Sequence, residues 1–164
     1  MRFLHNNDMG HRIGVVLRHK GLTMATAESC TGGTIASMVT AVAGSSDYFK
    51  GGVVSYAVSV KEQVLGVELH DGVVSEDTAL QMALGAARVC GADCAVATTG
   101  VAGPGASDGI PAGSVCVAAV RLCPNKDPKA IQRCQTLHLE GDREEVILQA
   151  ADAALRLLED LIAH

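Results

Sequence analysis

A serine at the start of a glycine-bearing turn is the residue of this sequence with the clearest chemical potential. Residues 26–33 read TAESCTGG and precede an apolar, small-residue run that is typical of a helix. A hydroxyl at a helix entrance faces unpaired backbone N–H groups, which can bind a phosphate or stabilise an oxyanion when the hydroxyl attacks a carbonyl. Ser29 is therefore a candidate nucleophile, and the alternative is that Ser29 or Thr31 simply caps the helix.

A serine nucleophile needs a base, and this sequence offers a lysine where a histidine is more usual. No histidine stands in an obvious position to serve, whereas Tyr56 and Lys61 are five residues apart at an expected strand end. A desolvated lysine can be neutral near the working pH, and a phenol can relay a proton between a serine and a lysine. Taken alone, Lys61 also fits a solvated surface charge and Tyr56 a half-buried packing residue.

Two further segments could hold an anionic ligand. The loop TTGVAGPG at 98–105 exposes backbone amides because its glycines leave little side-chain bulk, although turn geometry alone would also explain them. The loop lacks the Lys-Ser/Thr of a Walker loop and the GxGxxG spacing, which disfavours ATP and dinucleotides. Arg143 could reach a phosphate, but Asp142 as a helix cap explains the same Gly-Asp-Arg segment.

The cysteines and histidines show no spacing typical of a metal site. The cysteines form no CxxC pair and lie mostly among alanine and valine, which indicates reduced core residues. The histidines form no HExxH motif and no Cys/His ligand pattern. We therefore expect neither a metal nor an organic cofactor. These residues are Cys30, Cys90, Cys94, Cys116, Cys123, Cys134, His5, His11, His19, His70, His138 and His164.

The composition describes a small, acidic protein that is poor in aromatic residues. The 164 residues include 13 Lys and Arg against 18 Asp and Glu, a net charge of −5, and only 2% are aromatic. This balance disfavours nucleic-acid binding, and no apolar run reaches the roughly 20 residues that span a bilayer. Because the first residues also lack an apolar stretch of signal-peptide length, we expect a cytoplasmic protein without nucleic-acid or membrane partners.

Hydrophobic periodicity predicts alternating helices and strands. Because the strands are apolar enough to be covered on both faces, we expect one α/β domain over residues 1–164, with its core at about 8–162. Its architecture should be a three-layer α/β/α sandwich with a mixed central sheet, whose ligands gather at loops beyond the strand ends. The expected helices are 9–19, 35–42, 58–65, one from about 75, and 143–162; the expected strands are 22–27, 51–56, 94–98, 114–122 and 131–139.

Four segments read together resemble a known family. TAESCTGG (26–33), FKGGVVSYAVSVKEQVLGV (49–67), TTGVAGPG (98–105) and EGDREEV (140–146) occur in the order found in the CinA C-terminal domain family. The resemblance implies an amidohydrolase that converts nicotinamide mononucleotide and water to nicotinate mononucleotide and ammonia. It also implies a serine nucleophile assisted by tyrosine and lysine, which map onto Ser29, Tyr56 and Lys61.

The same resemblance and the loop positions give an expected set of substrate-binding residues. Members of the family often carry Asn-Glu where this chain has Val58-Ser59, a difference that bears on rate or substrate. The residues expected to hold the substrate or the oxyanion are Glu28, Cys30, Thr31, Gly32, Gly33, Ser45, Ser46, Thr99, Gly100, Ala102, Gly103 and Arg143.

Three alternatives stay open at the level of sequence. Cys30 is a rival nucleophile because thiolates are intrinsically better attackers than alcohols. The chain could instead be a catalytically silent pyridine-nucleotide-binding or regulatory module, or an amidase for a different small amide. Helices rich in small residues leave faces suited to subunit packing, so we also expect a homo-oligomer.

Overall fold

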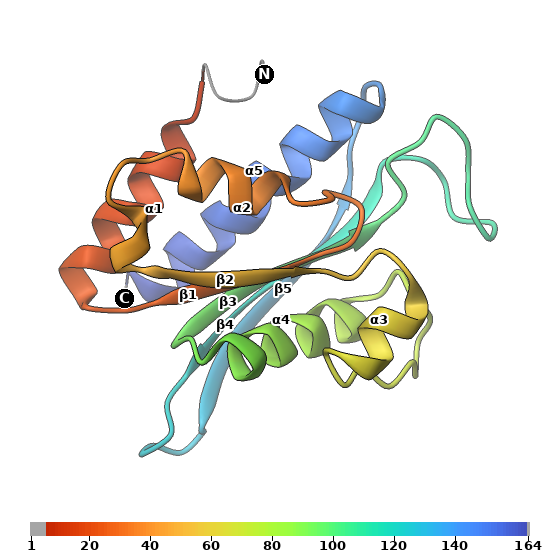
Figure 1. The fold of residues 1–164 in the computed structure, drawn as a ribbon. Helices are drawn as coiled ribbons and strands as arrows, with labels where there is room; N and C mark the ends of the chain where they lie inside the picture. The colour runs from red at the N-terminus through yellow and green to blue at the C-terminus, as the bar shows by residue number, and fades with distance from the viewer. Residues whose placement is uncertain (1–5, 164) are drawn as a thin grey trace.

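A computed structural model describes residues 6–163, which form a mixed five-stranded sheet with helices on both faces (Figure 1). The expected α/β/α architecture with a mixed sheet is therefore confirmed; residues 1–5 and 164, including His5 and His164, lie outside the described part of the expected domain. The strand order is β2-β1-β3-β4-β5, with β1 parallel to β2 and β3 and the other pairs antiparallel. The strands are β1 (Met24–Glu28), β2 (Phe49–Val54), β3 (Cys94–Gly100), β4 (Ser114–Leu122) and β5 (Ala130–His138).

The helices lie in two layers, as Figure 1 shows. Helices α1 (Asp8–Lys20), α2 (Thr34–Thr40) and α5 (Arg143–Ile162) lie on one side of the sheet, and α4 (Glu76–Cys90) lies on the other, next to α3 (Val58–Gln63). Capping fixes where the long helices begin. The Ser75 hydroxyl accepts from the Thr78 amide at 3.1 Å, and Asp142 forms a reciprocal capping box with Glu145, so both expected helix starts are confirmed.

The element that differs most from expectation is β2. It runs from Phe49 to Val54, two residues earlier than the expected 51–56, and leaves Tyr56 outside the strand. Gly51 and Gly52 lie within the strand as expected, and a side chain at Gly52 would collide with the Thr26 hydroxyl of the neighbouring β1. Two further differences are smaller: β3 continues to Gly100, and a short 3₁₀ turn, η2 (Ser45–Asp47), lies where we expected a loop.

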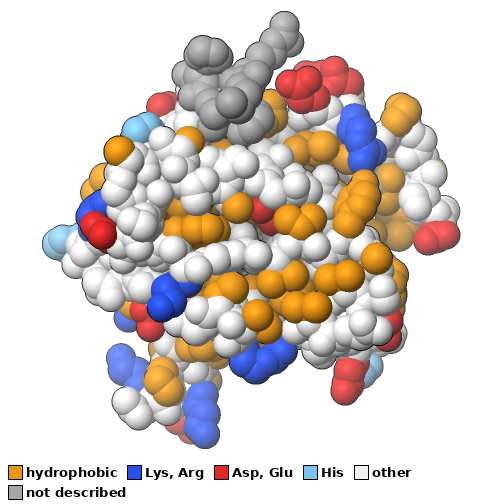
Figure 2. Space-filling view, in the orientation of Figure 1, with side chains coloured by type: hydrophobic (Ala, Val, Ile, Leu, Met, Phe, Trp, Pro, Cys, Tyr) orange, Lys and Arg blue, Asp and Glu red, His pale blue; other side chains and the backbone are white. Residues whose placement is uncertain are grey.

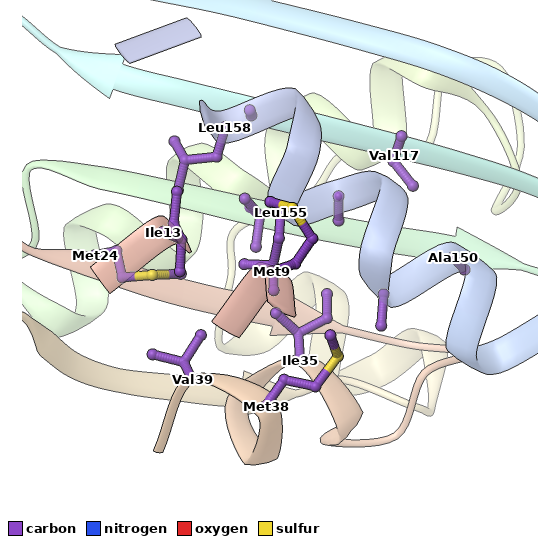
Figure 3. Close-up of a cluster of buried hydrophobic side chains, with 14 of the residues drawn as sticks. Met9, Ile13, Met24, Ile35, Met38, Val39, Val117, Ala150, Leu155 and Leu158 are labelled. Carbon is purple, nitrogen blue, oxygen red and sulfur yellow. The ribbon is translucent and has the colours of Figure 1, made fainter. Parts of the chain in front are cut away.

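The hydrophobic cores on the two faces of the sheet differ in the size of their side chains. On the α1/α2/α5 side, larger aliphatic residues and methionines interlock, among them Met9, Ile13, Met24, Leu155 and Leu158 (Figure 3). On the α4 side the buried layer is dominated by alanine, from α4 and from the inner strands. Because alanine side chains are short, α4 packs close to the sheet, and this core is filled without large aromatic side chains, as the aromatic-poor composition predicts.

This topology brings three loops to one edge of the sheet. Because β1, β2 and β3 run in parallel and are neighbours, the residues that follow Glu28, Val54 and Gly100 leave the sheet at the same end. From β1 the chain continues to β2 on one side and later to β3 on the other side. The crevice at the ends of such strands is where open α/β sheets usually bind ligands.

Hydrophobic side chains are also exposed next to β2, an edge strand. Val54, Tyr56 and Val58 all keep more than a third of their surface exposed. Figure 2 shows hydrophobic side chains gathered near the middle of this face, with charged groups mostly around its periphery. The expected homo-oligomer stays a prediction. No helix within residues 6–163 is both long and apolar enough to cross a membrane.

We expect Gly85→Ala to destabilise the protein by about 1–3 kcal/mol, because a methyl group on this α4 residue would collide with the backbone carbonyl of Leu65. Leu65 follows α3, whose position depends on this contact. Denaturant unfolding measures the change. Val89→Ala on an exposed part of α4 is the control, with an expected change within about 0.5 kcal/mol. Equal effects of the two substitutions would contradict the close packing described here.

Candidate active site

The strand ends place a serine hydroxyl against a lysine amine. Ser29 directly follows β1, and its amide donates to the Thr98 carbonyl of β3 at 3.0 Å. This hydrogen bond holds the serine backbone next to the end of β3. Lys61 reaches inward from α3, and its Nζ lies 3.0 Å from Ser29 Oγ. The expected convergence of the two side chains is therefore present in the structure. This distance allows direct proton transfer between them.

Lys61 is buried and is held by two carbonyl groups. Its side chain is only 1% exposed, and Nζ donates to the carbonyl oxygens of Ser55 at 2.6 Å and of Tyr56 at 3.4 Å. Carbonyl oxygens only accept hydrogen bonds, so in the neutral amine the two N–H groups point to them and the lone pair faces the Ser29 hydroxyl. The geometry therefore suits a lysine that takes a proton from Ser29.

The electrostatic surroundings of Lys61 favour the neutral amine. Burial lowers the pKa of its ammonium group below the ordinary lysine value. None of the ion pairs within residues 6–163 includes Lys61, so no carboxylate compensates for the lost hydration. A lysine in such surroundings can act as a general base at a lower pH than an exposed one.

Tyr56 reaches the site in a way that the sequence did not predict. Its phenol oxygen accepts from Nη2 of Arg143 at 2.9 Å, while Nη1 of Arg143 donates to the Gly103 carbonyl at 2.6 Å. Only the backbone carbonyl of Tyr56 contacts Lys61. The phenol is thus part of a bridge between the start of α5 and the 98–105 loop, and Ser29 meets Lys61 without it.

These groups open into a cavity of about 740 Å³. Nine of the expected site residues line it: Ser29, Cys30, Tyr56, Lys61, Thr99, Gly100, Ala102, Gly103 and Arg143. The Thr99 hydroxyl is already used, because it donates to the Val73 carbonyl at 2.8 Å. Thr99 therefore fixes the neighbouring 72–74 segment, and the glycines of the loop leave the backbone accessible to a ligand.

The other expected binding residues do not line the cavity. Gly32 and Gly33 form the turn before α2, with positive φ angles of 55° and 105° that favour glycine. Ser45 and Ser46 follow the opposite end of α2, a helix of seven residues that is about 10 Å long. Glu28 and Thr31 are buried and bind each other.

The start of α2 is also less available to an anion than the sequence suggests. The Glu28 carboxylate accepts from the amides of Ile35 at 2.8 Å and Ala36 at 3.0 Å. The Glu28 side chain thus occupies the position that we expected for a phosphate or an oxyanion. The amide of Cys30, which lines the cavity, remains a donor candidate for an oxyanion.

Cys30 has the wrong protonation state for a nucleophile. Burial raises the pKa of its thiol to about 11, so the neutral form dominates at neutral pH. This favours Ser29 over its neighbour as the attacking group. Across the described part of the chain, no three His, Cys, Asp or Glu side chains gather closely enough to hold a metal ion.

Several residues of the site were missed by sequence reasoning. Ser55 acts through its backbone carbonyl, which no side-chain pattern reveals. Val58 and Asp108 line the cavity, and so does the 72–74 segment, which had no motif. The Val58-Ser59 difference was an available signal for Val58, and the structure places Val58 on the cavity wall while Ser59 lies outside the lining.

The lowered pKa of Lys61 predicts a pH-dependent contribution to stability. The unfolded chain, with an ordinary lysine pKa, binds this proton at pH values at which the folded protein has released it. The free energy of unfolding of the wild type should therefore increase relative to Lys61→Met as pH rises from neutrality towards the ordinary lysine pKa. Denaturant unfolding between pH 7 and about 10 measures this difference. Lys50→Met, at an exposed lysine, is the control, and an equal slope for both variants would contradict the assignment.

Comparison with known proteins agrees with the order of these segments. The sequence profile of the CinA C-terminal domain matches residues 6–162. CinA-like proteins of Chlorobium phaeobacteroides and Chlorobium luteolum are 44% identical over 148 residues and 46% identical over 147 residues. The matches cover 87% and 86% of this chain but only 34% and 33% of the relatives, so the chain spans about a third of their length.

Solved structures agree with the fold. The crystal structure of the competence/damage inducible protein CihA from Agrobacterium tumefaciens has a TM-score of 0.86 at 35% identity, covering 96% of this chain and 95% of that one. A CinA superfamily protein from Escherichia coli has a TM-score of 0.82 at 31% identity, covering 94% and 91%. Because sequence and fold agree over nearly the whole chain, the protein belongs to the CinA C-terminal domain family.

Proposed function

We propose that this protein is an amidohydrolase that deamidates nicotinamide mononucleotide to nicotinate mononucleotide and ammonia. The observation that carries the proposal is the 3.0 Å contact between Ser29 Oγ and a buried Lys61 that no carboxylate of residues 6–163 neutralises, at the wall of a cavity. Such a pair generates an alkoxide-like nucleophile without a histidine. Membership of the CinA family supports this chemistry, and the substrate is taken from the family resemblance.

The reaction proceeds through a covalent ester. Neutral Lys61 takes the Ser29 proton as the serine oxygen forms a bond with the carboxamide carbon. The lysine ammonium then gives this proton to the nitrogen, the C–N bond breaks, and ammonia leaves. A water molecule hydrolyses the nicotinoyl ester with Lys61 again as base, which returns the hydroxyl proton to Ser29. The direct contact makes Lys61 the immediate base in this proposal.

The oxyanion and the nucleotide use different parts of the cavity. The amide of Cys30 stabilises the carbonyl oxygen as it becomes negative, a contribution of about 3 kcal/mol for a well-placed donor. Arg143, fixed between Tyr56 and Gly103, provides a cation for the phosphate. The 98–105 loop contacts the ribose through its backbone, and no metal or organic cofactor takes part.

The decisive variant is Ser29→Ala. Because it removes the nucleophile, we expect ammonia release from nicotinamide mononucleotide to fall at least about a thousandfold. Ser37→Ala, at an exposed serine outside the cavity lining, is the matched control and should retain wild-type turnover. Cys30→Ala should stay within a few-fold of wild type, because the thiol is neutral and does not attack.

The opposite pattern, with activity lost in Cys30→Ala and kept in Ser29→Ala, would reverse the assignment of the nucleophile. Binding of the nucleotide by the wild type without any ammonia release would favour the silent nucleotide-binding module. Release of ammonia from another carboxamide in preference to nicotinamide mononucleotide would indicate a different substrate, with Val58 as the first residue to exchange.

The dependence of kcat/KM on pH tests whether Lys61 is the general base. Because only the neutral amine accepts a proton and burial lowers the pKa of Lys61, kcat/KM should rise with pH and level off below the ordinary lysine pKa. Lys61→Arg, which stays protonated, should lose at least about a hundredfold in kcat. Initial rates of ammonia release between pH 6 and about 10 give the profile. A flat profile, or an active arginine variant, would exclude Lys61 as the base.

A further inference from the structure

The last residue of β1 carries a carboxylate that the proposed reaction does not use. Glu28 is completely buried, with 0% exposure, and lies directly before Ser29. Three donors converge on it: the Thr31 hydroxyl at 2.6 Å and the amides of Ile35 and Ala36. A buried carboxylate with three hydrogen bonds is well satisfied, so the cost of its burial is offset within the protein.

The carboxylate also fixes the direction of a hydrogen-bond chain. Thr31 Oγ1 lies 2.7 Å from Thr98 Oγ1, a contact in which either hydroxyl could in principle donate. Because the single proton of the Thr31 hydroxyl is directed to Glu28, the Thr98 hydroxyl must donate to Thr31. The chain therefore runs from Thr98 through Thr31 to Glu28, and every hydroxyl proton in it has one defined position.

Two of these residues, Thr98 and Glu28, also bind the backbone of the reacting site through their carbonyl groups. The Ser29 amide donates to the Thr98 carbonyl, and the Glu28 carbonyl accepts from the Ser55 amide at 2.8 Å. Ser55 in turn supplies the carbonyl that holds Lys61. The backbone that carries the nucleophile and the backbone that orients the base are thus joined at Glu28.

We propose that Glu28, Thr31 and Thr98 are positioning residues, which hold Ser29 Oγ against Lys61 Nζ by locking the turn after β1 to α2 and β3. This inference rests on the proposed Ser29–Lys61 chemistry. The Glu28 carboxylate is directed to the start of α2 and to Thr31, so it anchors the turn without pairing with Lys61.

Two substitutions of Thr31 distinguish a positioning role of its hydroxyl from a role of the side chain in packing. Thr31→Val keeps the shape of threonine but removes the hydroxyl from the chain, whereas Thr31→Ser keeps the hydroxyl. We expect kcat for ammonia release to fall about tenfold to a hundredfold in Thr31→Val, with KM within twofold of wild type, because a displaced nucleophile slows the chemical step. Thr31→Ser should restore most of kcat. Thr40→Val, which removes an exposed hydroxyl of α2, is the control and should leave both constants unchanged.

A second measurement does not need turnover. In Ser29→Cys, the introduced thiol can pass its proton to the neutral Lys61 amine, and the thiolate is then stabilised by the ammonium that forms. Its pKa should therefore be lowered, and its rate of alkylation by iodoacetamide against pH reports that contact. Mass spectrometry resolves this site from Cys30, whose raised pKa gives an internal reference. Combining Ser29→Cys with Thr31→Val should raise the alkylation midpoint, and combining it with Thr40→Val should not.

The outcomes are distinct. A raised midpoint in a folded double variant supports the positioning role even if the wild type releases no ammonia, in which case only the proposed function fails. An unchanged midpoint together with an unchanged kcat in Thr31→Val overturns the positioning role. An ordinary cysteine pKa for the introduced thiol in Ser29→Cys alone would also overturn it, since the contact to be positioned would then be absent.

Discussion

The burial of one unpaired lysine is the constraint on which the rest of this structure depends. An amine inside a protein loses its hydration, and among residues 6–163 Lys61 gains two backbone carbonyls and the hydroxyl of Ser29 in exchange. The surrounding elements have to hold these acceptors in place, since a small displacement would leave the amine without partners. All three follow the ends of β1 and β2, and the packing of α4 against the segment after α3 keeps the lysine directed inward.

The charged side chains of Glu28 and Arg143 differ in what they contact. Glu28 is used entirely within the protein, where it binds the start of α2. Arg143 faces the cavity from the start of α5 and is held by one phenol and one carbonyl, neither of which neutralises its charge. A protein with a net charge of −5 thereby presents a cationic group in its cavity, which is what an anionic substrate requires.

Periodicity predicted the order of the elements and several boundaries well. β4 and α5 were predicted with their observed limits, because a continuous buried run and a long 3.6-residue repeat leave little ambiguity. The limits of β2 were wrong, since Phe49 and Lys50 were left out of the expected strand, and Ser55 and Tyr56, which follow the observed strand, were included. The Ser29–Lys61 contact could be anticipated from residue types and motif order.

The directions of polar side chains were the part that sequence could not supply. Tyr56 turns to Arg143, which is 87 residues away in the chain, so its partner depends on how α5 packs. Glu28 looked like a binding residue because it adjoins the serine, but strand alternation directs it to the α2 face. Such choices follow from tertiary packing and from which donors remain free, which a local pattern does not specify.

The alanine-rich layer beneath α4 has a consequence for how this protein tolerates change over evolutionary time. On the opposite face, neighbouring aliphatic side chains can exchange volume, so that one grows as another shrinks. An alanine side chain cannot become much smaller to make room for a larger neighbour, so any enlargement must push α4 away from the sheet. We therefore expect the buried alanines of the α4 face to tolerate enlargement less well than the larger aliphatic residues of the opposite face.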